Sequence, residues 1–484
     1  MSNSPPTPRP PARPESVGAG GRFRPAVVSG PIGRTLFFLA LPVLGEQVLN
    51  TIVTLFDTWL AGRISPAATS AIGFAAYVGW LASMLAMLVA TGTTALVARH
   101  TGAGEPREAN RIANQSILLA GFLGIGIFAL IYALAPWFAQ QQNMTGETYA
   151  ITVHYLRVDA VGHFAMSLTF VGCAAMRGAG NMRMPMLIFA AINAFNIVAS
   201  LSLVYGIGPI PELGISGALI PKLGVYGIVW GTVSARMVGA VLTLIVLARG
   251  TSGLILRARD LAFHGATVRR ILRIGIPAAA DGAVMWVGHF LLLIVIARLA
   301  SGVLGEAYYA AHMIAVRVEA LTYLPAVAWG TATATMVGQS LGAGDRRRAA
   351  HAAHWAVLQC GTLSIAMAAF FYFGAELVYA IMSDDWLVRA AGVTPFRTLA
   401  LFQPILVASI VYIHALRGAG DTRFPMIVTL FGTFLFRVPM GYFFGITLSL
   451  GLAGGWMGMY CDMTWRAAAA SLRYLRGKWL KVEV

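Results

Sequence analysis

The chain has 484 residues, of which 58% are hydrophobic and only 11% are charged, and its formal net charge is +16. A soluble protein carries about 25% charged residues, so this chain could not cover a water-exposed surface with polar groups. These values exclude an ordinary soluble enzyme or binding domain. They favour a polytopic, all-α membrane protein.

Apolar stretches that are long enough to cross a bilayer recur along the whole chain. A membrane-spanning helix needs roughly 20 apolar residues, and residues 121–135 and 291–300 belong to stretches of that kind. The predicted spans are twelve: 35–60, 68–97, 112–136, 149–176, 184–205, 226–248, 273–299, 308–337, 350–374, 391–416, 424–446 and 453–472. Because their number is even, both termini should lie on the same side of the membrane.

Basic residues gather in alternate loops between these spans. The loops and ends on one side hold 26 of the 35 Lys and Arg residues, whereas the opposite loops hold only Arg63, Lys222, Arg298 and Arg389. Basic loops stay in the cytoplasm, so we predict a bacterial inner-membrane protein with both termini cytoplasmic. The positive charge then reflects topology and anionic lipids. It does not indicate nucleic-acid binding, since no basic, aromatic-interleaved soluble domain is present.

The two halves of the chain repeat one another. "RGAGNMRMPM" at 177–186 recurs as "RGAGDTRFPM" at 417–426, 240 residues later, and Pro42 aligns with Pro277 after a five-residue adjustment. Two six-helix halves that both begin in the cytoplasm run in the same direction, which makes them parallel repeats. We interpret the repeated phrase as a cytoplasmic turn. Its glycines permit positive φ, and its arginines are expected to hold the loop at the anionic membrane surface.

A duplicated six-helix bundle favours a transporter whose two lobes tilt around a substrate site near mid-membrane. The predicted organisation is a disordered cytoplasmic tail at 1–30, a first lobe at 31–250, a basic linker at 251–270, a second lobe at 271–473 and a basic tail at 474–484. A channel needs no such pairing. An enzyme would need a metal triad or a nucleophile with its base, and the sequence offers neither.

An ionisable residue within a span is costly and therefore marks a candidate site. The first span carries a polar row on one helical face, spaced by four, four and three residues: Glu46, Asn50, Thr54 and Asp57. Asp57 or Glu46 could bind a proton or Na⁺ in one state and release it in the other. Each could equally form a permanent ion pair or stay protonated as a hydrogen-bonding group.

Polar residues of the fifth and seventh spans extend this candidate site. Asn193, Asn196 and Ser200 share a face of the fifth span, where amides can coordinate a cation or simply hold helices together. Asp281 in the seventh span is the repeat equivalent of Glu46, because each follows a proline by four residues. We therefore count Asp281 as a candidate contact for substrate or a proton.

Three further charged residues are interpreted as charge partners or gates. Glu319 lies near mid-depth of the eighth span, and Arg157 and Arg397 lie in the outer halves of the fourth and tenth spans. We expect Arg157 to pair with Asp57, which lies at a similar depth.

The remaining ionisable residues favour structural roles. Asp462 and Arg466 are four residues apart in the last span and are predicted to form an intrahelical ion pair. His351 and His354 lack a third ligand, and the three cysteines show no paired spacing. No metal site and no disulfide are predicted.

With these residues in place, the chain resembles the MATE family, the multidrug and toxic compound extrusion transporters, from about residue 34 to 473. The resemblance rests on "LFDTWLAG" at 55–62, "YLRV" at 155–158, "GAGE" after the second span and the two copies of the repeated phrase. It implies a twelve-helix fold of the MOP superfamily. It also implies a secondary antiporter that exports organic cations and amphipathic drugs, driven by inward H⁺ or Na⁺, with no other cofactor.

The resemblance also carries over some site residues. Asp57 falls where many members have an acidic residue important for coupling, and Asn196 matches an asparagine of the prokaryotic pattern. The chain departs from the family at Ser200, where some members have aspartate, and at Met285, which replaces an acid. Because neither branch's cation site transfers whole, the choice between H⁺ and Na⁺ stays open. Glu46 is our own candidate for the missing charge.

Two other functions remain as alternatives. A flippase for lipids or lipid-linked oligosaccharides, from the same superfamily, would need a cationic cleft, for which Arg157, Arg317 and Arg397 leave some room. An intramembrane enzyme or a receptor would need a catalytic set or a sizeable soluble domain. For the antiporter we expect cationic or amphipathic small molecules and anionic membrane lipids as partners, and a monomeric chain.

Overall fold

The computed structural model describes residues 27–142, 144–208, 221–251, 253–257 and 260–482. The predicted disordered tail at 1–30 falls outside these residues as far as residue 26. The described residues are helical along nearly their whole length, in agreement with the predicted all-α fold.

Twelve long helical segments within the described ranges correspond to the twelve predicted spans. The first half contains α1 (Ile32–Gly62), α2 (Pro66–Gly102), α3 (Pro106–Gln141), α4 (Gly146–Gly178), α5 (Arg183–Tyr205) and α6 (Val225–Ala248). The second half contains α7 (Gly265–Ala297), α8 (Gly302–Gly342), α9 (Arg346–Met382), α10 (Trp386–Gly418), the composite segment described next, α13 (Gly451–Leu475) and a short 3₁₀ turn, η6 (Lys478–Lys481).

The eleventh segment is interrupted by two π-helical turns. It runs as α11 (Arg423–Phe431), η4 (Gly432–Arg437), α12 (Val438–Tyr442) and η5 (Phe443–Thr447). A π-helical turn adds a residue to the helical repeat and is frequent at functional sites. Residues beyond such a turn are rotated relative to an uninterrupted α-helix, which matters for Arg437 at the end of η4.

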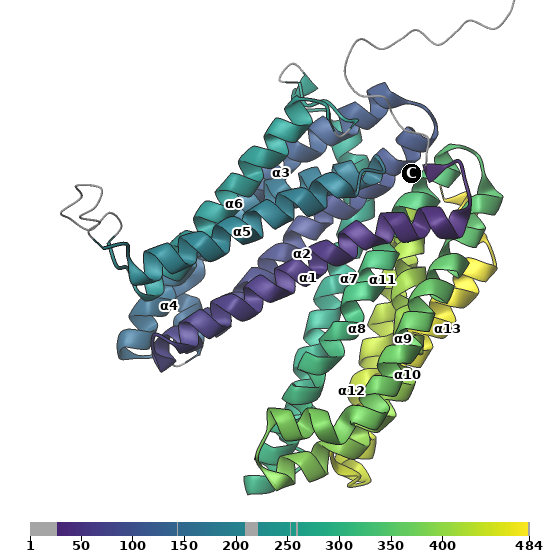
Figure 1. The fold of residues 1–484 in the computed structure, drawn as a ribbon. Coiled ribbons are helices and arrows are strands. Elements are labelled where there is room, and N and C mark those ends of the chain that lie inside the picture. The colour runs from purple at the N-terminus through teal and green to yellow at the C-terminus, as the bar shows by residue number, and fades with distance from the viewer. Residues whose placement is uncertain (1–26, 143, 209–220, 252, 258–259, 483–484) are drawn as a thin grey trace, which may run out of the picture.

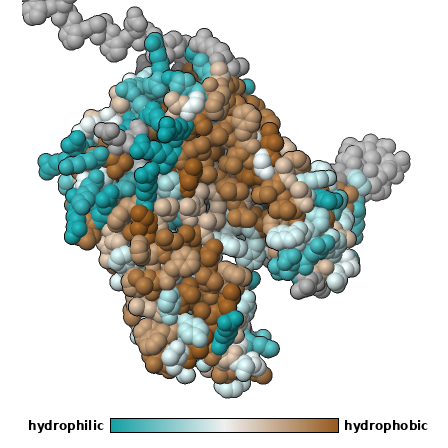
Figure 2. All heavy atoms as spheres, turned by 180° about the vertical axis from the view of Figure 1, so that it is seen from behind, coloured by the Kyte–Doolittle hydropathy of each residue, from teal (hydrophilic) through white to brown (hydrophobic). Residues whose placement is uncertain are grey.

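The described helices form a multi-pass membrane protein. Ten of the segments are long and apolar enough to cross a membrane, whereas α8 and α13 carry more polar residues and fall outside that set. Large apolar side chains lie exposed on the outer surface, as Phe373 and Ile381 do, and Figure 2 shows apolar side chains along the helices with hydrophilic ones gathered toward the ends. Such a surface suits lipid rather than water.

The helices form two groups that meet at one end and diverge at the other. Figure 1 shows α1–α6 on one side and α7–α13 on the other, joined at the end where the C terminus lies. Figure 2 shows a notch between the two limbs at the opposite end. The bounds predicted for the two lobes stay a prediction.

Reciprocal glycine contacts bring α2 and α8 together at the joined end. A Cβ on Gly102 would lie 1.9 Å from the backbone oxygen of Gln339. A Cβ on Gly342 would lie 1.9 Å from the backbone oxygen of Arg99. Gly342 lies 240 positions after Gly102, and Gln339 lies 240 positions after Arg99, so the two contacts occupy equivalent positions of the repeat. Only glycine permits the backbones to approach this closely.

The first helix of each half packs against the other half near the joined end. In α1, Leu36 and Val43 belong to an apolar cluster built largely from α8, α9 and α10. In α7, Ile271 and Ile274 belong to a cluster built largely from α2, α3 and α4. Further along, Leu60 of α1 packs with α5 and α6 of its own half. Each first helix therefore crosses between the halves and links them.

Candidate functional site

Glu46 on α1 is held in an ion pair inside the protein. The Nη2 of Arg177, near the C-terminal end of α4, lies 2.5 Å from Oε1 and 2.7 Å from Oε2 of Glu46, which is 3% exposed. Its repeat equivalent behaves in the same way, because buried Asp281 on α7 pairs with Arg417 near the C-terminal end of α10. Of the two alternatives left open for Glu46, the structure shows the ion pair.

These pairs correct the interpretation of the repeated phrase. We expected its arginines to hold a loop at the lipid surface, but Arg177 and Arg417 begin the two phrases and both point inward. Each terminates a long helix and is largely enclosed, so its charge is balanced by a carboxylate rather than by lipid. The phrase is therefore part of the internal structure of each half as well as a turn, with Gly180 and Gly420 at positive φ.

Asp57 lies near the C-terminal end of α1, is half-buried, and has a different environment. Its Oδ1 is buried and accepts no hydrogen bond from any residue that the structure describes. The charges that act on it are those of Arg236 on α6 and Asp159 on α4. The predicted pair with Arg157 is wrong, because the Arg157 guanidinium lies over the ring of Tyr132, 5.1 Å from its centroid. Arg157 and Asp159 are two residues apart on α4 and face different directions.

A buried charge network beside Asp57 was missed in the sequence. Arg236 donates from Nη1 to Oδ1 of Asp159 at 2.7 Å, and Nε2 of His163 lies 2.9 Å from Oδ2 of the same carboxylate. Asp159 and His163 are each 5% exposed. Their spacing of four residues on one helix was a signal that could have indicated the contact. Arg236, the partner of Asp159 on α6, had no such signal in the sequence.

The polar row of α5 connects α1 to α6. Asn193 donates from Nδ2 to Oδ1 of Asn50 at 3.0 Å, which joins α5 to α1. Asn196 donates from Nδ2 to Oγ1 of Thr232 on α6 at 3.1 Å. Among the described residues, Oδ1 of Asn196 and Oγ of Ser200 are buried without a partner. This part of the site thus presents oxygens that lack donors.

In the second half, one carboxylate faces two arginines. Asp462 on α13 accepts from Nε of Arg437 at 2.8 Å and from Nε of Arg466 at 2.6 Å. The intrahelical pair of Asp462 with Arg466 is confirmed. Arg437, at the end of the π-helical turn η4, was not predicted, and its Nη1 also lies 3.2 Å from Nδ1 of His289.

Glu319 and Arg397 do not come together. Glu319 on α8 is buried, and its only hydrogen bond within the described chain is a long one of 3.5 Å from Gln403. Arg397 pairs instead with Glu376 at 2.8 Å on the outer surface. Across the described part of the spans, Asp57 and Glu319 are therefore the enclosed carboxylates that lack a salt-bridge partner, one in each half.

Comparison with known proteins places the chain in a family. The family model described as MatE matches residues 42–201 and 277–443, which together exceed half of the chain. The two matches begin at Pro42 and Pro277, the prolines that align in the repeat. Each half therefore resembles the same model separately.

Similar proteins and structures extend over nearly the whole length. The chain is 29% identical to "Probable multidrug resistance protein NorM" of Thermotoga maritima, over 93% of this chain and 94% of that protein. It is 28% identical to multidrug resistance protein PmpM of Pseudomonas aeruginosa, over 92% and 91% of the two chains. The fold matches a structure of a multidrug resistance MATE family transporter of the MOP superfamily in an outward-facing conformation, with a TM-score of 0.84, 23% identity and coverage of 94% and 98%.

The family match and the fold agree with one another. The family match and the names of the relatives indicate transport rather than catalysis. The chain belongs to the MatE family of membrane transporters.

Proposed function

We propose that this protein is a secondary active antiporter of the bacterial inner membrane. It exports organic cations and amphipathic drugs in exchange for H⁺ or Na⁺. The substrate class is supported by the relatives, whose names describe multidrug resistance. The observation that carries the coupling mechanism is the environment of Asp57.

Asp57 is an acid in a membrane span with a buried oxygen that accepts no hydrogen bond in the described structure, and the arginine that acts on it, Arg236, is already paired with Asp159. The other acids of the first half's interior, Glu46 and Asp159, are held by arginines. An uncompensated carboxylate in a membrane is costly. It is relieved when a proton or Na⁺ binds. A group of this kind can exchange an inorganic cation for an organic one.

The oxygens of α5 offer additional ligands for Na⁺. Hard cations bind carboxylate, amide and hydroxyl oxygens, and Asn196 and Ser200 each present one without a donor in the described structure. The helices that bear these groups and Asp57 pack together through Leu60 and Val204. The same oxygens could also accept hydrogen bonds from a protonated carboxyl group. Both coupling ions therefore stay within the proposal.

The joined end of the molecule supports alternating access. If the basic loops and both termini are cytoplasmic, the notch in Figure 2 faces outward. The reciprocal contacts of Gly102 and Gly342 then form the cytoplasmic closure. An inward-facing state requires α2 and α8 to separate at these glycines, so that the two groups of helices tilt relative to one another.

The same topology supports anionic lipids as partners. A recess of about 350 Å³ lies among the ends of α7, α11 and α13, where Arg273, Arg423 and Arg473 meet Phe424 and Ile427. Basic pockets between transmembrane helices on the cytoplasmic side suit lipid phosphates. The alternative of a lipid flippase is not favoured, because the relatives' names describe multidrug resistance and because Arg157 and Arg397 already contact Tyr132 and Glu376.

Transport by reconstituted protein tests the antiporter. Liposomes that contain the protein and an imposed gradient of either H⁺ or Na⁺ are followed with ethidium, a cationic dye. We expect dye movement to depend on one of the two gradients and to be lost in Asp57→Asn. The matched control, Glu376→Gln, removes an exposed carboxylate and should transport normally. Dye movement that ignores both gradients, or that persists in Asp57→Asn, would overturn the proposal.

A further inference from the structure

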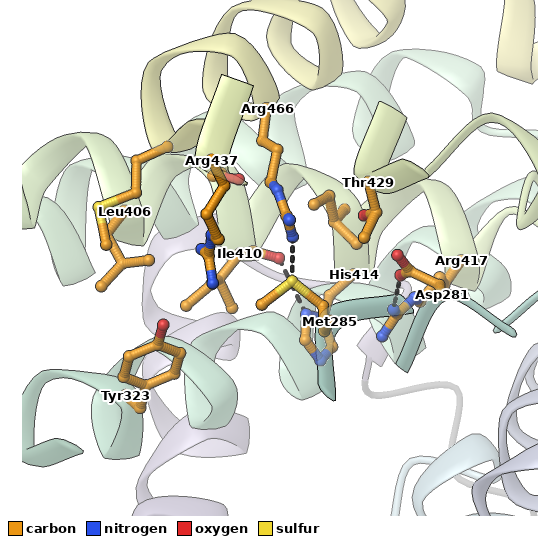
Figure 3. Close-up of a pocket in the computed structure, with 13 residues that line it drawn as sticks. Asp281, Met285, Tyr323, Leu406, Ile410, His414, Arg417, Thr429, Arg437 and Arg466 are labelled. Carbon is orange, nitrogen blue, oxygen red and sulfur yellow. Dashed lines mark hydrogen bonds and ion pairs between the residues drawn. The ribbon is translucent and has the colours of Figure 1, made fainter. Parts of the chain in front are cut away.

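The second half contains a partly open cavity of about 120 Å³ among α7, α8, α10, the eleventh segment and α13. Figure 3 shows three arginines at its wall, Arg417, Arg437 and Arg466, with Met285 between them. An engineered cavity of about 150 Å³ holds one benzene molecule. The cavity can therefore hold a halide ion or a carboxylate group.

The cavity wall offers hydrogen-bond donors that lack good acceptors. Arg466 gives its Nε to Asp462 and its Nη2 to Thr433, but its Nη1 points at the thioether sulfur of Met285 (Figure 3). Sulfur is a weak acceptor. The buried hydroxyl of Thr429 and the Nε of Arg417 have no hydrogen-bond partner in the described structure, and Oδ1 of Asp281, an acceptor on the same wall, has none either. An unmet buried donor is costly, so an acceptor in the cavity would be favourable.

The charges around the cavity do not cancel. Its three arginines face two carboxylates that pair with them, Asp281 and Asp462. His414 lines the cavity, and His289 lies against Arg437, but a histidine contributes no negative charge. Counted without Glu319, these groups leave one positive charge in excess.

Glu319 is the buried acid of the described second half that has no arginine partner. It is bonded to Gln403 rather than to an arginine, and Tyr323, one turn further along α8, lines the cavity. Glu319 is thus close enough to reduce the excess positive charge when ionised, without occupying the place of an anion. Glu319→Gln should strengthen anion binding and never weaken it.

We propose that this arginine-lined cavity binds a small anionic group, either a free halide or the carboxylate of an amphoteric substrate. The group would accept hydrogen bonds from Arg466 Nη1, Arg417 Nε and Thr429 Oγ1. Charge-assisted bonds of this kind are the strong ones. The proposal does not depend on the coupling role of Asp57. It concerns binding, which can be measured without transport.

Two substitutions at Met285 test the site. Met285→Glu places a carboxylate against Arg466 and so supplies the anion from within, while Met285→Leu conserves volume without adding charge. The melting temperature of detergent-purified protein is measured while chloride or acetate replaces methanesulfonate, which carries no carboxylate, at constant Na⁺ and ionic strength. We expect the melting temperature of the native protein and of Met285→Leu to rise by about 2 °C and then to level off as the anion concentration increases. Met285→Glu should show no such rise.

The outcomes of this experiment are decisive, because a general effect of salt would act on both variants alike. An equal rise in Met285→Glu and Met285→Leu would overturn the proposal, as would the absence of any rise in the native protein. Glu319→Gln should reach saturation at a lower chloride concentration than the native protein. Saturation at a higher concentration would contradict the predicted position of the excess charge.

A competition measurement distinguishes the two sources of the anion. The two probes are norfloxacin, a fluoroquinolone that carries a carboxylate, and its methyl ester. Their fluorescence reports how much of each is bound to the native protein as chloride is added. If chloride displaces the acid but not the ester, the cavity holds the carboxylate of the substrate. If chloride raises the melting temperature but displaces neither, the cavity holds an inorganic anion. Both results support an anion site and differ only in its occupant.

Discussion

The first and second halves of the molecule carry the same ion pair at the same place in the repeat. Glu46 joins α1 to α4 through Arg177, and Asp281 joins α7 to α10 through Arg417. Each acid follows the internal proline of a helix that crosses between the halves. An ion pair that is present in both halves is part of the structure that the halves share, and it does not depend on what each half binds.

The other buried charges differ between the halves. The first half has Asp57 with an oxygen that lacks a donor, beside a carboxylate already occupied by Arg236. The second half has one carboxylate between Arg437 and Arg466 and a cavity with excess positive charge. The comparison separates two roles. Charges shared by the halves hold the helices, whereas charges found in one half are candidates for binding opposite kinds of ligand.

The largest effect should come from breaking a shared pair. Arg177→Gln or Arg417→Gln leaves a buried carboxylate without its partner, which costs about 3–5 kcal/mol of stability. Thermal unfolding of the purified variants measures this cost. The double variant Glu46→Gln/Arg177→Gln removes both charges and should recover most of the loss. Clearly unequal costs for the two arginines would show that the pairs are not equivalent.

A smaller effect should come from the contact between the halves. Gly102→Ala or Gly342→Ala places a Cβ against a backbone oxygen. Such overpacking costs about 1–3 kcal/mol. Because the cost falls on the closed end alone, the equilibrium should shift roughly tenfold or more toward separation of α2 and α8.

Pulsed EPR distances between labels on the α2–α3 and α8–α9 loops measure this shift. Gly121→Ala is a matched control, since a Cβ on Gly121 would meet no atom within 4 Å. Unchanged distances in Gly102→Ala and Gly342→Ala would show that the glycines do not form the closure. A change in only one of them would mean that the two contacts are not equivalent.

The fold could be predicted because its signals are local or repeated. Apolar stretches of sufficient length gave the spans, and the recurring phrase indicated the duplication. The intrahelical contact of Asp462 with Arg466 followed from a spacing of four residues. The same rule applied to Asp159 and His163 would have indicated the buried network of the first half. The expected partner of Asp57 was Arg157, which lies two residues from Asp159 and faces Tyr132 instead.

The long-range pairs could not be predicted from one sequence. Glu46 and Arg177 are 131 residues apart, and the position of Arg177 at the end of a span suggested contact with lipid rather than with an acid. Arg437 presents a second kind of limit. Its direction depends on the π-helical turn η4, because the additional residue in that turn rotates the side chain away from its expected face. No spacing rule for an α-helix places it opposite Asp462.

The smallest effect concerns which arginine acts on Asp57. A double-mutant cycle that combines Asp57→Asn with Arg157→Gln should give a coupling energy within about 0.5 kcal/mol of zero, as for residues that share no partner. The cycle of Asp57→Asn with Arg236→Gln should give a larger value, because Arg236 acts electrostatically on Asp57. Thermal unfolding of the three variants and the two doubles supplies both numbers. A larger coupling with Arg157 would restore the pair expected from the sequence, and the outer part of α4 would then have to turn toward α1 in another conformation.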